Sequence, residues 1–223
     1  MKLKYLIRSK NFIQYLDKSQ LIVCTFCLIC FSIISTFVVT GAASSLDENL
    51  LVLIRQELPD WFVYVARISY FLGEAEVAGV FVFISLVVLV KKRCWEEAKV
   101  TAFSTLAILI LIDRILKPFF AIPRPSERLV ANAFGKSFPS GHAAGNLLLY
   151  FLWCYFISQK YPRLKPFLYS LATFLIILMG ISSAYLRVHW VSDILASYCL
   201  GYGIFSLAIA ILKIAKNNGS MLS

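Results

Sequence analysis

Charge is scarce in this chain, and histidine is scarcer still. Of its 223 residues only 15% are Asp, Glu, Lys or Arg and two are histidine, whereas 60% are hydrophobic. An ordinary soluble domain is about half apolar and about a quarter charged, so a globule of this size could not bury so much apolar surface. The same figures exclude a disordered chain, a coiled coil and a disulfide-rich secreted scaffold. The sequence therefore predicts a membrane protein that crosses the bilayer several times.

Cysteines are absent from every loop that we expect to face outward. Five of the six lie inside apolar runs, and Cys94 lies in a basic loop, so we predict no disulfides. The basic residues, which give a net charge of +10, form no continuous face. They lie in short clusters between the apolar runs, which favours contact with anionic lipid headgroups and excludes a nucleic-acid-binding surface.

Six apolar runs are long enough to cross a bilayer, which takes about 17 to 25 residues. They cover residues 20–40, 74–90, 99–116, 142–158, 167–185 and 190–212. Between the first two runs, residues 45–73 mix acidic with apolar and aromatic side chains, as in an amphipathic helix at the membrane interface. The predicted fold is all-α: a polytopic membrane helical bundle of six transmembrane helices plus an interfacial helix, forming one domain over residues 1–223.

The positions of Lys and Arg predict the orientation of the bundle. Most of the 22 basic residues fall on one side of the six-span arrangement, namely Lys2, Lys4, Arg8, Lys10, Lys18, Lys91, Lys92, Arg93, Lys99, Lys160, Arg163, Lys165, Lys213 and Lys216. The positive-inside rule makes that side cytoplasmic. Both termini are then cytoplasmic, and the loops at 41–73, 117–141 and 186–189 face outward.

The two histidines both fall at the outward edge of a predicted span. His142 follows Pro139-Ser140-Gly141, and His189 precedes Asp193 by four residues. On a helix this spacing puts His189 and Asp193 on one face. The carboxylate can then accept a hydrogen bond from one imidazole nitrogen and raise the nucleophilicity of the other. An interhelical hydrogen bond would explain one membrane histidine, but two at the same face favour a chemical site.

A cationic loop precedes the first histidine. Lys117 stands seven residues before Arg124, and prolines stiffen the segment between and after them. Lysine supplies a point charge, and arginine a planar fork that matches phosphate oxygens. Ser140 and Gly141 lie where a helix begins, so their amides can bind an anion. Asp113 can pair with Lys117 four residues later, or it can be neutralised by Arg114; the sequence leaves both open.

These residues, taken in order, resemble the three-part signature of the type-2 phosphatidic acid phosphatase family. The matching segments are Lys117…Arg124-Pro125, then Pro139-Ser140-Gly141-His142, then Tyr185-Leu186…His189…Asp193. The resemblance implies a phosphatase that uses no metal or other cofactor. It implies that His189 attacks phosphorus to give a phosphohistidine, that Asp193 orients His189, and that His142 protonates the leaving group. Lys117, Arg124, Ser140 and Gly141 would bind the phosphate.

The third motif departs from the family pattern. The family has an arginine six residues before the nucleophilic histidine, where this chain has Ser183, while an arginine stands at Arg187. Loss of one phosphate donor from a preorganised site typically costs about 3 kcal/mol. We expect Arg187 to reach the phosphate from its shifted place, since on a continuous helix it would project only about 40° away from position 183.

The predicted function is therefore that of a lipid phosphatase in a bacterial inner membrane, with its site facing the periplasm. By resemblance, undecaprenyl diphosphate is the leading substrate, and phosphatidate, phosphatidylglycerophosphate and a lipid A phosphate stay open. A lipid-to-lipid phosphotransferase would use the same residues. A transporter or an inactive lipid-binding relative is the non-enzymatic alternative. A membrane bilayer and a lipid phosphate are the expected partners, and neither nucleic acid nor an obligatory protein partner is inferred.

Overall fold

The computed structural model describes residues 17–131 and 133–220. Lys2, Lys4, Arg8 and Lys10, which support the predicted orientation, lie outside them. The described residues contain helices and no strand, in the order α2 (Lys18–Val39), α3 (Ser44–Glu57), α4 (Phe62–Leu72), α5 (Ala75–Lys91), α6 (Trp95–Ile110), the π-helix η1 (Leu111–Leu116), α7 (Lys117–Phe120), α8 (Gly141–Lys160), the 3-10 helix η2 (Pro162–Leu164), α9 (Lys165–Tyr185) and α10 (Val191–Ser220). The all-α prediction is confirmed.

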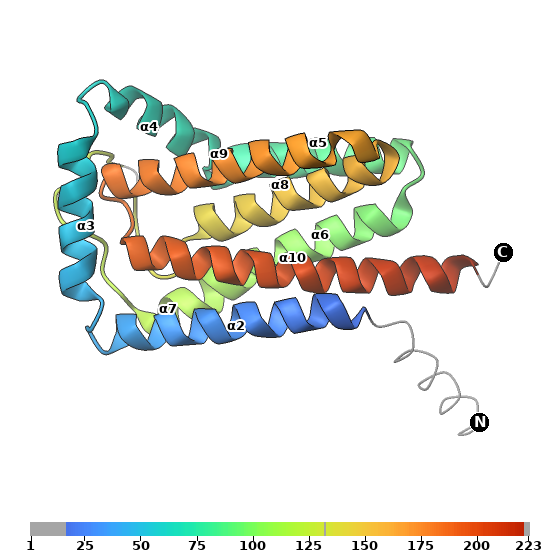
Figure 1. The fold of residues 1–223 in the computed structure, drawn as a ribbon, viewed down its shortest axis with the longest axis horizontal. Helices are drawn as coiled ribbons and strands as arrows, with labels where there is room; N and C mark the ends of the chain where they lie inside the picture. The colour runs from blue at the N-terminus through green and yellow to red at the C-terminus, as the bar shows by residue number, and fades with distance from the viewer. Residues whose placement is uncertain (1–16, 132, 221–223) are drawn as a thin grey trace.

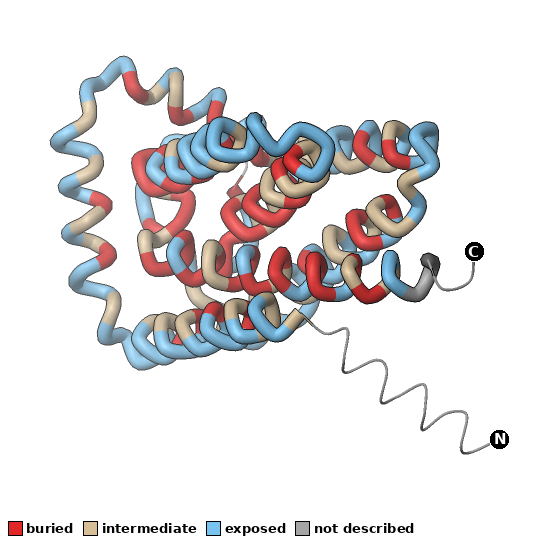
Figure 2. Tube along the Cα trace, turned by 45° about the vertical axis from the view of Figure 1, so that its right-hand side comes forward, coloured by how far each residue is buried: buried red, intermediate tan, exposed pale blue. Residues whose placement is uncertain are grey.

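The long helices lie side by side, and α3 lies across one end of the bundle (Figure 1). α10 packs against both α2 and α8, so that the last helix of the chain contacts the first described one. Phe31, Leu148, Leu200 and Ile209 belong to the largest buried cluster at this junction. The buried residues lie on the inward sides of the helices, and the outward sides are exposed (Figure 2).

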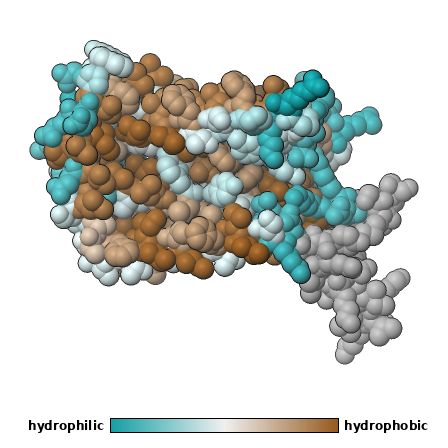
Figure 3. All heavy atoms as spheres, viewed as in Figure 1, coloured by the Kyte–Doolittle hydropathy of each residue, from teal (hydrophilic) through white to brown (hydrophobic). Residues whose placement is uncertain are grey.

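The exposed sides of the helices are apolar, as a bilayer requires. Figure 3 shows a hydrophobic band between two hydrophilic ends. Lys18–Val39, Pro162–Tyr185 and Val191–Asn217 are each long and apolar enough to cross a membrane, and α4 with α5 makes a fourth candidate that is bent by 50°. The chain is a multi-pass membrane protein, and the count of six spans stays a prediction.

The segment 45–73 differs from the single interfacial helix that the sequence predicts. It forms two helices, α3 and α4, separated at Leu58–Trp61. Leu58 precedes Pro59 and has extended backbone angles, because a residue before proline is sterically excluded from the helical region. α4 then turns at Gly73 into α5.

The C-terminal end of α9 also differs from expectation. The helix ends at Tyr185, and Arg187 takes a left-handed backbone conformation with φ of 55°. The amide of Arg187 donates to the carbonyl of Ala184, and that of Val188 donates to the carbonyl of Ser183, both at 2.9 Å. This is the hydrogen-bond pattern of a Schellman motif. The helix therefore does not continue from position 183 to position 187.

Candidate active site

His189 lies in the short connection between α9 and α10, immediately before the first turn of α10. Its side chain is 1% exposed. Burial lowers its pKa well below the usual 6.5, and the positive charges of Arg124 and Lys117 lower it further. A buried imidazole near two cations avoids a third positive charge. His189 is therefore neutral at physiological pH, which is the nucleophilic form.

Arg124 contacts the ring of His189 directly. Its Nη1 lies 3.2 Å from Nε2 of His189 and donates to the carbonyl of Val188 at 2.9 Å, while its Nη2 donates to the carbonyl of Phe134 at 3.1 Å. A guanidinium can donate but cannot accept. Nε2 must therefore be the unprotonated nitrogen of His189, and its lone pair points toward the cation that would hold a phosphate.

The other ring nitrogen of His189, Nδ1, faces two side-chain oxygens. Nδ1 lies 3.4 Å from Oδ2 of Asp193 and 3.4 Å from Oγ of Ser137. Asp193 is fully buried on the first turn of α10, and its Oδ2 also accepts hydrogen bonds from the Ser137 hydroxyl and from the amide of Trp190. This arrangement holds the proton on Nδ1 and leaves Nε2 unprotonated.

Lys117 lies at the end of a π-helical turn. Its Nζ pairs with Oδ1 of Asp113 at 2.6 Å, so the structure has the first of the two pairings that the sequence left open. Short π-helical segments often occur at functional sites. The pair fixes the ammonium, whose charge acts on both His189 and Asp193.

The Pro-Ser-Gly-His segment starts α8 as the sequence predicts. Ser140 is the N-cap residue, and its hydroxyl accepts from the amide of Ala143 at 3.3 Å. Its own amide donates to the hydroxyl of Ser197 at 2.7 Å. The backbone amide of Ser140 is therefore used inside the protein, and its hydroxyl and Gly141 at the first position of the helix are the groups left for an anion.

His142 occupies the first turn of α8, within electrostatic range of His189, Lys117 and Arg124. Its ring stacks on Tyr70 of α4, with 4.6 Å between ring centroids and 12° between the ring planes. Its Nε2 is buried and has no hydrogen-bond partner among the residues that the structure describes. A buried nitrogen without a partner is costly, and such atoms often serve a ligand or a reaction.

The backbone around His142 is held by Asn146. The side-chain amide of Asn146 donates to the carbonyl of His142 at 3.0 Å and to that of Gly73 at 3.1 Å. A Cβ at Gly73 would come within 3.0 Å of the His142 ring. The glycine thus allows the bend between α4 and α5 to pack directly against the histidine.

Arg187 does not lie where the sequence analysis expected it. Its Nη2 pairs with Glu48 of α3 at 2.5 Å, and its Nε donates to the carbonyl of Ser126 at 3.1 Å. The expectation assumed a continuous helix, and the left-handed turn at Arg187 removes that helix. Ser183, at the family's arginine position, is buried and donates to the carbonyl of Met179. Arg187 therefore uses its guanidinium to join α3 to the loop at 126.

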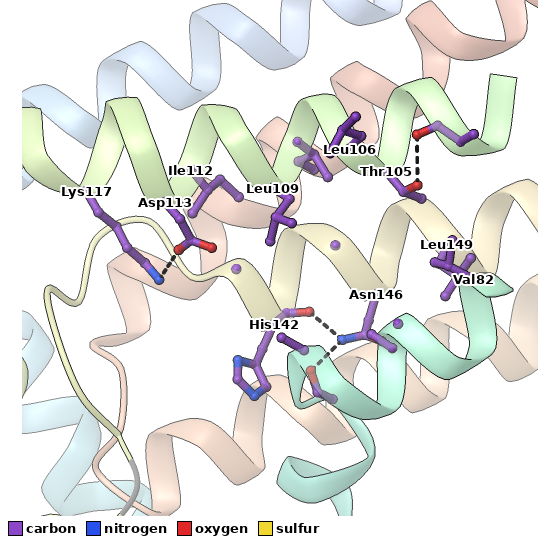
Figure 4. Close-up of a pocket in the computed structure, with 18 of the residues that line it drawn as sticks. Val82, Thr105, Leu106, Leu109, Ile112, Asp113, Lys117, His142, Asn146 and Leu149 are labelled. Atoms are coloured by element: carbon purple, nitrogen blue, oxygen red, sulfur yellow. Dashed lines mark hydrogen bonds and ion pairs between the residues drawn. The ribbon is translucent and has the colours of Figure 1, made fainter. Parts of the chain in front are cut away.

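A cavity of about 450 Å³ lies between α5, α6 and α8, and Lys117 and His142 are among the residues that line it. Its polar end carries Asp113, Lys117 and His142, and Val82 and Leu149 lie at the opposite, apolar end (Figure 4). No cluster of three or more metal-ligating side chains occurs in the described part of the chain. The site thus combines two histidines, two cations and a carboxylate with an apolar cavity.

A helical membrane fold that carries two histidines beside two cations is the arrangement expected of a membrane phosphatase. A family model described as the PAP2 superfamily matches residues 98–217, which is just over half of the chain. The chain therefore belongs to the PAP2 superfamily, the type-2 phosphatidic acid phosphatases, and the resemblance seen in the sequence is confirmed. It is a membrane lipid phosphatase, a hydrolase. The metal-independent reaction that the resemblance implies is consistent with this family.

A relative by sequence and a solved structure, both from Bacillus subtilis, are similar to this chain. Phosphatidylglycerophosphatase B of strain 168 is 29% identical over 192 residues, which cover 79% of this chain and 88% of the relative. The crystal structure of a transmembrane PAP2-type phosphatidylglycerolphosphate phosphatase superposes with a TM-score of 0.75 and 24% identity, over 90% of this chain and 97% of that one. The superposition on this crystal structure supports the fold.

Four residues that contact the site or its supports lie outside the sequence motifs. They are Asp47, Tyr70, Ser137 and Asn146. Ser137 lies only five residues before His142, so a search for hydroxyls beside the motif would have found it. The other three come from α3, α4 and the interior of α8, and no local pattern marks them.

Proposed function

We propose that this protein hydrolyses the phosphomonoester of phosphatidylglycerophosphate at its two-histidine site. The observation that carries the proposal is the contact between Arg124 and Nε2 of His189, because it puts a phosphate-binding cation beside an unprotonated nitrogen. The activity named for the B. subtilis relative supports this choice of substrate. Undecaprenyl diphosphate, which the sequence resemblance favours, is the second candidate.

The reaction proceeds in two steps. In the first, the lone pair on Nε2 of His189 forms a bond to phosphorus while the bond from phosphorus to the ester oxygen breaks. The departing oxygen takes a proton from His142, and Lys117, Arg124 and the Ser140 hydroxyl hold the phosphoryl oxygens. In the second, His142 removes a proton from water, which attacks phosphorus and releases inorganic phosphate and free His189. In a phosphotransferase a lipid hydroxyl would replace that water.

The apolar chain of the lipid occupies the cavity in this proposal. The cavity has a volume of about 450 Å³, within the range of ligand sites, roughly 300 to 1,000 Å³. Its polar end is the catalytic end, so a lipid whose phosphate reaches His189 would place its chain along α5, α6 and α8. An added Cβ at Gly145 would meet nothing within 4 Å, which means that this glycine leaves cavity space open.

Replacing Gly145 with leucine should therefore fill the cavity without a backbone clash. We expect the KM for a long-chain lipid phosphate to rise about tenfold, since displacement of two or three methylene groups costs roughly 1–3 kcal/mol. The KM for a short-chain phosphate ester is the matched control and should stay within about twofold. An equal rise in KM for both substrates would contradict the placement of the lipid's apolar chain in the cavity.

The orientation in this proposal puts the site on the periplasmic side of a bacterial inner membrane and both termini in the cytoplasm. The basic loops after α5 and α8 support it through the positive-inside rule. They lie at the end of the bundle opposite to α3 (Figure 1). The whole chain, residues 1–223, acts as one domain.

Phosphate release by the purified protein in detergent tests the proposed function. Phosphatidylglycerophosphate, undecaprenyl diphosphate, phosphatidate and a lipid A phosphate should be compared with a chelator present, for the wild type and for His189→Gln. We expect the highest kcat/KM on phosphatidylglycerophosphate and a loss of at least about 1,000-fold in the variant. Activity that disappears with the chelator and returns with magnesium or zinc would refute the histidine mechanism.

A further inference from the structure

Ser137 stands outside the three motifs that identify the family, yet it contacts the segment that carries Arg124 and the segment that carries His189 and Asp193. Its amide donates to the carbonyl of Ile122 at 2.8 Å, two residues before Arg124. Its hydroxyl donates to Oδ2 of Asp193. The hydroxyl oxygen, Oγ, also lies 3.4 Å from Nδ1 of His189. The side chain is completely buried.

These contacts give the hydroxyl two roles at once. Its hydrogen is used on Asp193, so its lone pair is available to the N–H at Nδ1 of His189. Asp193 Oδ2 lies at the same 3.4 Å from Nδ1, and the two oxygens therefore share one donor. Both separations are longer than a typical N–H···O bond of about 2.9 Å, which leaves room for both bonds to shorten when the ring becomes charged.

We infer that Ser137 is a positioning residue for the nucleophile, which orients the carboxylate of Asp193 and the ring of His189 together. The inference rests on the proposed function, because it concerns the step in which Nε2 bonds to phosphorus. In that step the ring gains positive charge and Nδ1 becomes a stronger donor. A second acceptor that is itself anchored to the carboxylate stabilises the charged ring and keeps Nε2 aimed at the phosphorus atom.

The test compares Ser137→Ala and Ser137→Cys with the wild type. Alanine removes the hydroxyl, whereas cysteine keeps a weak donor of similar size. We expect kcat on phosphatidylglycerophosphate or phosphatidate in micelles to fall about 10- to 100-fold for alanine, the size expected for a lost bond to a charged group. Cysteine should give an intermediate kcat. KM should change less than about twofold, because the hydroxyl acts through the ring.

Inhibition by orthovanadate adds a readout that a purely structural role would not change. Vanadate adopts the five-coordinate geometry of phosphoryl transfer, so its inhibition constant should rise in parallel with the loss in kcat. Ser206→Ala is the matched control, since Ser206 is equally buried and its hydroxyl has no hydrogen-bond partner in the described chain. Its kcat, vanadate inhibition and melting temperature should equal those of the wild type.

Two results would overturn the inference. One is a kcat for Ser137→Ala within about twofold of the wild type, and the other is a cysteine variant no more active than alanine at an unchanged melting temperature. Both results are distinguishable from failure of the proposed function. In that case His189→Gln would keep the wild-type turnover.

Discussion

The two histidines of the site are held in different ways. His189 is almost completely buried, and both of its nitrogens face side chains: Arg124 on one side, Asp193 and Ser137 on the other. His142 lines the cavity, its ring stacks on Tyr70, and its Nε2 faces no partner among the described residues. Hydrogen bonds thus fix the proposed nucleophile, whereas ring stacking and the backbone of α8 fix the proposed acid.

This contrast matches the two chemical tasks. A nucleophile must approach phosphorus along one direction, and a network of charged hydrogen bonds supplies that direction. A general acid must first give up a proton and then take one back, so a ring nitrogen without a protein partner suits it.

Replacing His142 with glutamine should affect substrates unequally. For an alkyl phosphate, whose leaving oxygen needs a proton, kcat/KM should fall about 100- to 10,000-fold. For p-nitrophenyl phosphate, whose leaving group is stable as an anion, the loss should be much smaller. His189→Gln is the control and should abolish both reactions. An equal loss on both esters in His142→Gln would show that His142 is not the acid.

Replacing Tyr70 with leucine should weaken the same step more mildly. An aromatic stack contributes about 0.5–1.5 kcal/mol beyond its buried area, so kcat/KM for alkyl esters should fall about 2- to 10-fold. Tyr70→Phe keeps the ring and should behave as the wild type. A phenylalanine variant as slow as the leucine variant would mean that the hydroxyl, and not the stack, supports His142.

The burial of His189 predicts how stability depends on pH. Its pKa is lowered in the folded protein. Below pH 6.5 the unfolded state therefore binds a proton at His189, whereas the folded state does not. The free energy of unfolding should therefore fall with decreasing pH, by at most about 1.4 kcal/mol per unit. Melting in detergent between pH 7 and pH 5 should show this loss in the wild type.

The same pH series in His189→Gln removes the contribution of His189 together with its coupling to Asp193 and His142. Asp47, whose pKa is raised mainly by burial, acts in the opposite direction, but it is present in both proteins and cancels in the difference. The variant should lose less stability than the wild type on acidification. Identical slopes would mean that His189 is not held neutral in the folded protein.

The smallest effect is expected at Arg187. Arg187→Gly should leave kcat and KM within about twofold of the wild type, because the guanidinium is occupied by Glu48 and Ser126. Glycine also adopts the left-handed conformation at this turn without strain. This gain offsets part of the stability lost with the ion pair to Glu48. A loss of tenfold or more in kcat/KM would show that Arg187 contributes to phosphate binding.

The helices were predictable because bilayer-spanning runs are a strong signal. The expected run 20–40 corresponds to α2 at Lys18–Val39, and 167–185 to α9 at Lys165–Tyr185. What failed was local geometry. Pro59 divides the interfacial segment in two, and the turn after Tyr185 is left-handed although an arginine, and not a glycine, occupies it. Glycine is the usual sequence signal for such a turn, and here the signal is missing.

The candidate site was predictable where its residues are close in sequence or belong to a motif. The spacing of His189 and Asp193 indicated their pairing, and Lys117 and Arg124 were found by their charge. Contacts between distant segments could not be found in this way. Asn146 and Gly73 are 73 positions apart, and only the packing of α8 against the bend between α4 and α5 brings them together.

One contact from α3 has a consequence for the position of Asp193. Asp47 accepts hydrogen bonds from the amide and the hydroxyl of Ser192, at 2.9 and 2.5 Å, at the start of the helix that carries Asp193. On the same α3, Leu46 and Leu53 are exposed and would rest among lipids. Two hydrogen bonds thus tie α3 to the residue three positions after His189, so a displacement of α3 would also displace the turn that carries Asp193.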